Sequence, residues 1–122
     1  MSTHELGDFI TDLKEDDIPV DEFCIFGIVH AYPEHADALE AVYAETTRLA
    51  ASEPGMIYYC LARDNDDRNV FHFFERYKGR KAFDEHNSQP VIEKLINEDK
   101  YIKAVRAKFV KAIQPAAKPA GQ

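Results

Sequence analysis

The chain has 122 residues, 45% of them hydrophobic and 30% charged, which suits one globular domain with a single core. It has no apolar run of the roughly 20 residues that cross a membrane and no leader of the secretory type, so we expect a cytoplasmic protein without a membrane partner. The formal net charge of −7 lies entirely in residues 1–22, and the balanced remainder offers no basic surface for nucleic acid.

These first 22 residues are predicted to be an acidic extension that precedes the folded domain. They contain eight acidic residues and one lysine. Apolar residues at positions 6, 9, 10 and 13 have helical spacing, which predicts a short amphipathic helix over Ser2–Leu13. Two interpretations remain open: a solvated acidic arm, or a segment whose apolar stripe packs on the core or on a second subunit.

The middle of the chain alternates between strand and helix patterns. Strands are predicted at Phe23–Tyr32, Met56–Asp64, Val70–Tyr77 and Ala104–Ile113, and helices after Pro33, over Gly79–Asn87 and after Pro90. The order β-α-β-β-α-β predicts a ferredoxin-like α+β domain over residues 23–113, whose four-stranded antiparallel sheet is covered by helices on one face. Residues 114–122 lack core-forming side chains and are expected to be a disordered tail.

The predicted strands are apolar on both alternating faces, although the helices can cover only one face of the sheet. The first strand, Phe23–Tyr32, shows this most clearly. A chain of this length has no further element for the second face, so we predict a homodimer in which a second copy covers it. The two cysteines, Cys24 and Cys60, are predicted to be reduced, buried thiols.

Short motifs follow one another in a characteristic order between Pro54 and His86. They are Pro54-Gly55, Tyr59, Arg63-Asp64, Phe71, Glu75-Arg76, Tyr77, Phe83 and His86. In this order and spacing they resemble the antibiotic biosynthesis monooxygenase family, over about residues 22–113. The resemblance implies a dimeric α+β barrel, in which two sheets face each other and each subunit keeps a pocket between its own sheet and helices.

The resemblance implies a choice among several chemistries. Family members include cofactor-independent oxygenases of anthrones and hydroquinones, quinol oxygenases, haem-degrading enzymes and an isomerase of a phosphorylated sugar, so the fold does not select the reaction. Haem-degrading members of the family have an axial histidine late in the chain, a pocket tryptophan and an asparagine near the first strand. This chain has no tryptophan, no histidine after His86 and no asparagine in Phe23–Tyr32, so the comparison argues against haem degradation. Tyr77 stands where the family has a tryptophan at the end of a strand.

His86 and Glu75 are the candidate catalytic bases. Oxygenation without a cofactor needs a base that removes a phenolic proton, because a phenolate reduces O₂ more readily than a phenol. His86 matches the family motif, and the alternative is a helix-end histidine that caps carbonyls or bonds across a dimer. Glu75 lies within a strand, where a carboxylate is either a base with a raised pKa or one half of a structural ion pair with an arginine.

Four further residues are candidates for substrate binding: Tyr59, His72, His30 and Phe74. For Tyr59 the alternative is a core tyrosine with a satisfied hydroxyl, and for the two strand histidines it is a structural role. His30, His72, Glu75 and His86 lack the HxH or HExxH spacing of metal sites, and no glycine-rich loop indicates a nucleotide or flavin. We therefore expect neither a metal nor an organic cofactor.

The leading hypothesis is a homodimeric, cofactor-independent monooxygenase that acts on an electron-rich aromatic such as a hydroquinone or anthrone. A second hypothesis is an isomerase of a small oxygenated metabolite, which would use the same base without O₂. A third is a non-catalytic dimeric ligand-binding module, for which the acidic extension would be a docking device.

Overall fold

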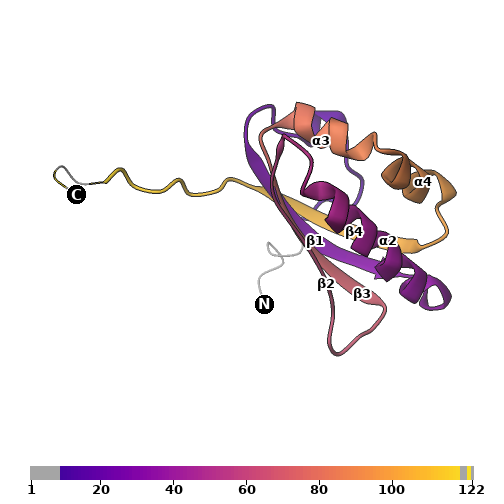
Figure 1. Cartoon of the computed structure of the whole chain (residues 1–122). Coiled ribbons are helices and arrows are strands. Elements are labelled where there is room, and N and C mark those ends of the chain that lie inside the picture. The colour runs from indigo at the N-terminus through magenta and orange to yellow at the C-terminus, as the bar shows by residue number, and fades with distance from the viewer. Residues whose placement is uncertain (1–8, 119–120, 122) are drawn as a thin grey trace.

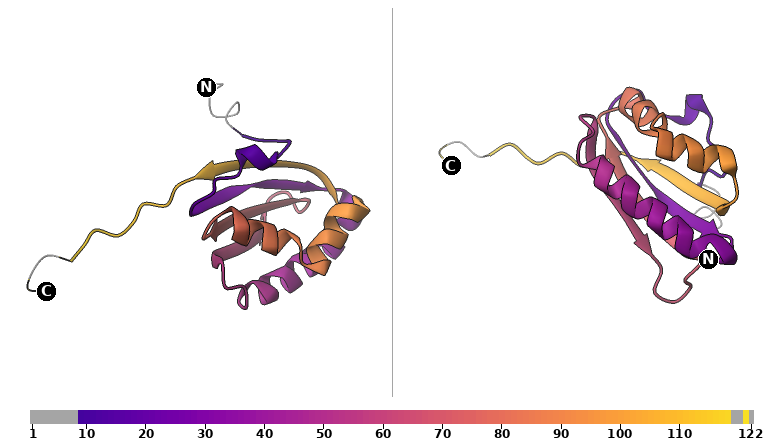
Figure 2. Two further views of the ribbon diagram at one scale, coloured as in Figure 1. Left: turned by 90° about the horizontal axis from the view of Figure 1, so that it is seen from above. Right: turned by 45° about the vertical axis from the view of Figure 1, so that its right-hand side comes forward.

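The computed structural model describes residues 9–118 and residue 121. Its four strands are β1 (Phe23–Ala31), β2 (Met56–Arg63), β3 (Val70–Tyr77) and β4 (Ile102–Val110), and its α-helices are α2 (Ala36–Ala50), α3 (Arg80–Asn87) and α4 (Pro90–Glu98). Glu15–Asp17 and Pro33–His35 form short 3₁₀ helices. The strands form one antiparallel sheet in the order β2-β3-β1-β4, and the α-helices lie on one side of it (Figures 1 and 2). This confirms the predicted ferredoxin-like α+β fold. No helix of the described residues is long and apolar enough to cross a membrane.

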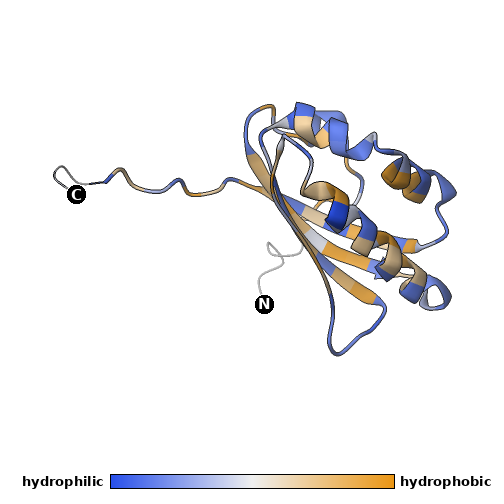
Figure 3. Cartoon of the chain, in the orientation of Figure 1, coloured by the Kyte–Doolittle hydropathy of each residue, from blue (hydrophilic) through white to orange (hydrophobic). Residues whose placement is uncertain are grey.

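The central strand β1 sets the register of the sheet. Phe23 lies opposite Tyr77 of β3, and Val29 lies opposite both Phe71 of β3 and Val105 of β4. These side chains point toward the helices because neighbouring residues of a strand point to opposite faces. Hydrophobic residues accordingly follow the strands (Figure 3) and form two buried clusters, one around Phe23 and Tyr77 and one around Val29 and Phe71.

The opposite face of the sheet, called here the outer face, carries no α-helix of the described residues. Phe74 stacks on Phe26 and meets Tyr58 edge to face, yet Phe74 is 41% exposed and Tyr58 is 52% exposed. Cys24 is buried as predicted, but Cys60 is exposed. The prediction for Cys60 was wrong because β2 is an edge strand and Cys60 points to the uncovered face.

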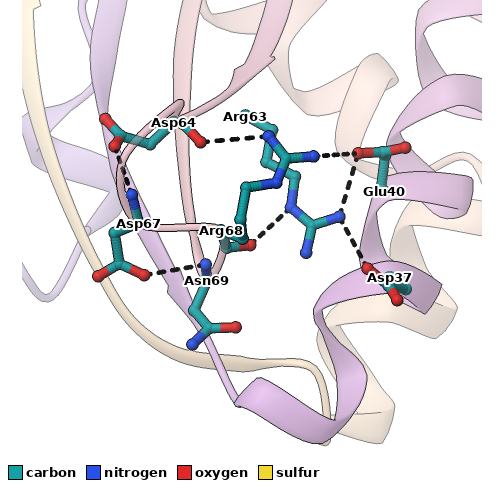
Figure 4. A network of polar contacts seen from close by, with 7 residues as sticks. All are labelled: Asp37, Glu40, Arg63, Asp64, Asp67, Arg68 and Asn69. Carbon is teal, nitrogen blue, oxygen red and sulfur yellow. Dashed lines mark hydrogen bonds and ion pairs between the residues drawn. The ribbon is translucent and has the colours of Figure 1, made fainter.

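The hairpin between β2 and β3 is fixed to α2 by a polar network (Figure 4). The Arg63 guanidinium donates to Asp37 at 2.9 Å and to Glu40 at 3.2 Å, and its Nε donates to the carbonyl of Arg68 at 2.6 Å. The Asp64 carboxylate accepts the backbone N–H groups of residues 66 and 67 and so closes the turn. Arg63 therefore attaches the hairpin to α2, while Asp64 closes the turn.

At the two ends of the chain, the structure agrees only in part with the predicted secondary structure. The helix predicted over Ser2–Leu13 lies partly outside the described residues, and residues 9–13 are not helical. The Ile10 N–H and carbonyl bond instead with Ala107, at the free edge of β4. Beyond β4, residues 111–118 form no helix or strand and extend away from the sheet (Figure 1).

Candidate functional site

A cavity of about 340 Å³ lies between the sheet and the helices. All four strands and all three α-helices contribute to its walls, which are largely aliphatic and aromatic, for example Ile25, Phe73 and Leu95. A few ionisable and hydroxylic side chains interrupt this apolar surface. Mostly apolar walls with a few placed polar groups are typical of small-molecule sites.

His86 of α3 lines the cavity and pairs with Glu53, which lies in the loop after α2. His86 Nδ1 is 2.9 Å and 3.0 Å from the two carboxylate oxygens of Glu53. Because a carboxylate only accepts hydrogen bonds, this contact places the imidazole proton on Nδ1. No described residue forms a hydrogen bond with Nε2, whose lone pair is therefore free for a ligand.

Burial lowers the pKa of His86, and the Glu53 carboxylate opposes this effect. The imidazole is therefore neutral near neutral pH, as a general base requires. A glycine allows the pair to form: a Cβ at Gly55 would overlap the Cβ of Ala82 on α3. The absence of a side chain there lets the loop of residues 53–55 pack directly on the helix that carries His86.

Glu75 of β3 also lines the cavity, and it has no arginine partner among the described residues. The Tyr77 hydroxyl donates a hydrogen bond to its carboxylate. Burial raises the pKa of Glu75 to about 7, mainly by removing water from around the charged form, and the bond from Tyr77 only partly offsets this. Near neutral pH the group is therefore divided between its acid and its carboxylate forms.

Tyr59 of β2 faces the cavity and is held by Thr46 of α2. Its hydroxyl lies 2.8 Å from Thr46 Oγ1, which in turn donates to the Tyr43 carbonyl at 3.1 Å. The carbonyl can only accept, so a chain of bonds from Tyr59 to Thr46 to Tyr43 satisfies all three groups. The oxygen of Tyr59 then keeps lone pairs for a ligand, while burial raises the pKa of this phenol and keeps it neutral.

The structure brings three of the six sequence-predicted site residues together: His86, Glu75 and Tyr59. The rings of Tyr59 and His86 are 5.2 Å apart, and those of Tyr77 and His86 are 5.7 Å apart. Which of these residues act on a substrate remains a prediction.

The other three, His30, His72 and Phe74, lie on the outer face and are absent from the cavity. His72 pairs with Asp64 at 2.8 Å, within the hairpin. In β3, Phe74 and Glu75 are neighbours, so they must face opposite sides of the sheet. For the same reason His30 and His72 do not converge with Glu75 and His86 into a metal-binding set.

Sequence reasoning missed Glu53 and Thr46. Glu53 lies in a polar stretch that ends a helix, and Thr46 lies on a helix face with several apolar neighbours. No local pattern distinguishes either residue, because His86 lies 33 residues from Glu53 and Tyr59 lies 13 residues from Thr46.

The charge of the cavity limits what it can bind. The described residues that line it include no lysine or arginine, whereas Glu75 lines it and Glu53 lies directly behind His86. A phosphate or carboxylate group would enter this site without a cationic partner, at a high desolvation cost. The site therefore suits a neutral, largely apolar molecule that carries hydroxyl groups.

The fold and this site define a ferredoxin-like α+β domain with an apolar cavity that carries acid–base groups. The sequence model described as "Antibiotic biosynthesis monooxygenase" matches residues 23–98. The chain belongs to this family. None of the curated protein sequences compared with the chain matches it significantly.

Solved structures share the fold at low sequence identity. PA3566 from Pseudomonas aeruginosa is 19% identical, with a TM-score of 0.69, and the match covers 77% of this chain and 96% of that chain. SO0527 from Shewanella oneidensis is 20% identical, with a TM-score of 0.65 and coverages of 76% and 92%. A candidate antibiotic biosynthesis monooxygenase from Chloroflexus aurantiacus is 22% identical, with a TM-score of 0.64 and coverages of 79% and 97%.

Proposed function

We propose that this protein is a cofactor-independent monooxygenase of a neutral, electron-rich aromatic such as a hydroquinone or an anthrone. The observation that carries the proposal is the His86–Glu53 pair, which presents an unprotonated Nε2 at an apolar cavity. Family membership supports the reaction class, and the absence of lysine and arginine among the described cavity residues favours a neutral aromatic over a phosphorylated or carboxylated metabolite.

In the proposed reaction, Nε2 of His86 takes the proton of a substrate hydroxyl. Glu53 stabilises the imidazolium through Nδ1, and the imidazolium stays beside the phenolate as its counter-ion. The phenolate transfers electrons to O₂, the two combine into a peroxide on a ring carbon, and the imidazolium returns its proton to give the hydroperoxide. Neutral His86 then takes the proton of the C–H bond at the same carbon as the O–O bond breaks, so that one oxygen atom stays in the product as a carbonyl, the other leaves as hydroxide and is protonated to water, and the substrate supplies all four electrons.

Two further residues support this sequence of proton transfers. The oxygen of Tyr59 can accept a hydrogen bond from a second substrate hydroxyl and so orient the ring. Because the pKa of Glu75 is about 7, its acid form can donate a proton to the departing oxygen. The apolar walls keep the phenolate poorly solvated, which strengthens its interaction with the imidazolium.

Oxygen consumption with a panel of hydroquinones and anthrones tests the proposal. We expect the natural chain to consume O₂ and to place one ¹⁸O atom in the product, and His86→Ala to lose about 10²- to 10⁴-fold in rate, the usual contribution of a general base. Glu53→Gln keeps an acceptor for Nδ1 but removes the charge, so its rate should fall and the acid limb of its pH profile should move to lower pH.

The matched control is His35→Ala, because His35 meets Tyr101 edge to face and does not line the cavity. Its rate should equal that of the natural chain. An absence of O₂ consumption across the panel, or an unchanged rate in His86→Ala, would overturn the proposal.

A further inference from the structure

The N-terminal segment of residues 9–18, called here the strap, lies before the part of the chain that the family model matches. Three solved structures match this chain over 92–97% of their own lengths and over 76–79% of its length. The strap lies outside the part of the chain on which family membership rests. Figure 2 shows it in indigo alongside β4.

The strap is attached to the free edge of β4 through Ile10. The Ile10 N–H donates to the Ala107 carbonyl at 2.6 Å, and the Ala107 N–H donates to the Ile10 carbonyl at 2.9 Å. Phe9 reaches the outer face, where its ring meets Phe26 edge to face at 5.9 Å and lies under the Arg106 guanidinium at 5.5 Å. The strap therefore contacts the sheet in two ways: Ile10 bonds with the backbone of β4, and Phe9 packs against side chains on the outer face.

The other end of the strap is attached to α3, the helix that carries His86. Ile18 is 6% exposed and belongs to the buried cluster around Phe23. The Arg80 Nε donates to the Ile18 carbonyl at 2.9 Å. A Cβ at Gly79 would overlap the Val20 carbonyl oxygen, so this glycine allows the chain after the strap to pack directly on the start of α3.

Between these attachments the strap borders the cavity. Ile10, Thr11 and Leu13 line it, although Leu13 is still 40% exposed, and Asp12 and Glu15 are exposed to solvent. The strap therefore has an apolar side toward the cavity and an acidic side toward water. The apolar side stabilises a bound apolar substrate, and the acidic side repels an anion.

We propose that the strap is a wall of the substrate cavity and that Ile10 and Leu13 are specificity-determining contacts for the apolar part of the substrate. The inference rests on the proposed function in that it concerns the same cavity, but it does not depend on the reaction. Its consequence is that residues 9–18 of the acidic extension belong to the binding site and are not merely a solvated arm.

The chain has no tryptophan, so a single tryptophan can report on the strap. In Leu13→Trp the new indole should be partly shielded from acrylamide, because Leu13 lines the cavity but is 40% exposed, and its emission should change saturably with tert-butylhydroquinone, kept under nitrogen so that no turnover occurs. The matched control is Val20→Trp, because Val20 follows the strap, is 68% exposed and does not line the cavity. Its indole should be fully accessible and indifferent to the hydroquinone.

Two smaller changes measure the contacts themselves. Leu13→Ala should weaken hydroquinone binding about three- to tenfold in calorimetry, as expected for the loss of one or two buried methylene equivalents. Ile10→Pro cannot donate to the Ala107 carbonyl, so in the Leu13→Trp background it should increase acrylamide quenching while circular dichroism stays unchanged.

Equal acrylamide quenching at positions 13 and 20 would overturn the inference, whether or not the hydroquinone binds. Hydroquinone binding that leaves the indole at position 13 unaffected would also overturn it. Shielding at position 13 without any hydroquinone binding would support the wall and would count against the proposed function, so the two failures are distinguishable.

Discussion

At the scale of single residues, the site combines two carboxyl groups in different roles. Glu53 is paired with His86 and fixes the position of the imidazole proton. Glu75 has only a phenol as its hydrogen-bond partner, and burial raises its pKa to about 7. The two carboxyl groups therefore have different partners: an imidazole for Glu53 and a phenol for Glu75.

Glu75→Gln should gain stability relative to the natural chain as pH rises. The folded state of the natural chain binds the Glu75 proton more tightly than the unfolded state, because the pKa rises from 4.5 to about 7 on folding. Its contribution to the free energy of unfolding is therefore complete below about pH 4.5 and is lost as pH rises through about 7. Glutamine does not ionise and loses no such contribution. The advantage in free energy of unfolding that Glu75→Gln gains over the natural chain between about pH 4.5 and about pH 8 should therefore be on the order of 3 kcal/mol.

Urea denaturation at several pH values measures this difference. Glu93→Gln, at an exposed position on α4, is the control and should follow the natural chain at every pH. If the Glu75→Gln curve stayed parallel to that of the natural chain from about pH 5 to 8, the raised pKa of Glu75 would be wrong.

Residue roles were only partly predictable from the sequence. Neighbouring residues of a strand point to opposite faces of the sheet, so Glu75 and Tyr77 lie on one face of β3, and Phe74 and His72 on the other. Glu75 and Phe74 therefore could not both line one cavity. The family motif placed His86 among the candidate residues, but it did not point to Glu53. Glu53 acquires its role only because the loop at Gly55 packs against α3.

At the scale of secondary structure elements, the position of α2 depends on the β2–β3 hairpin. Arg63 stacks over Phe71 at 5.2 Å and binds two carboxylates of α2, with only 11% of its side chain exposed. Because α2 supplies Tyr43 and Thr46 to the cavity, this contact also helps to set the position of Tyr59.

Arg63→Met should destabilise the fold by about 1–3 kcal/mol, because the apolar stem remains while the charge-assisted hydrogen bonds are lost. Urea denaturation at neutral pH measures the change. Arg48→Met is the matched control: Arg48 pairs with Glu45 on the surface of α2, with 68% of its side chain exposed, and should cost little. Equal destabilisation by the two changes would show that the hairpin network contributes no more than a surface ion pair.

Most elements followed from the sequence because their patterns are local. The hydrophobic alternation of β3 and the Gly-Arg start of α3 were predicted within one residue of their observed bounds. The segment before β1 was not, since Ile10 bonds with a strand almost one hundred positions away. The apolar residues of that segment have helical spacing, but the free edge of β4 offers hydrogen-bond partners for the backbone of the segment. The segment pairs with this edge and does not form the predicted helix over residues 9–13.

At the scale of the whole molecule, the outer face remains the strongest indication of a second copy. Phe74, Tyr58 and Phe26 form an aromatic group there, and no α-helix of the described residues covers it. We therefore keep the homodimer as a prediction, with the outer faces of two copies in contact.

Phe74→Asp should convert this dimer into a monomer, because association would bury two unpaired carboxylates between the sheets. Light scattering coupled to size-exclusion chromatography measures the mass directly. Val20→Asp places the same charge at another exposed apolar position, away from the outer face, and should remain dimeric. A Phe74→Asp protein that keeps the mass of two chains would locate the interface elsewhere.

The sequence by itself determined the element order, the fold class and the family, because all three depend on hydrophobic period and on motifs with short spacing. The tertiary structure decided which ionisable groups meet: it paired His86 with Glu53, placed Glu75 beside Tyr77 and moved three candidate residues to the outer face. It also placed the strap on the wall of the cavity. These outcomes depend on burial and on contacts between distant positions, and neither is encoded in the spacing of neighbouring residues.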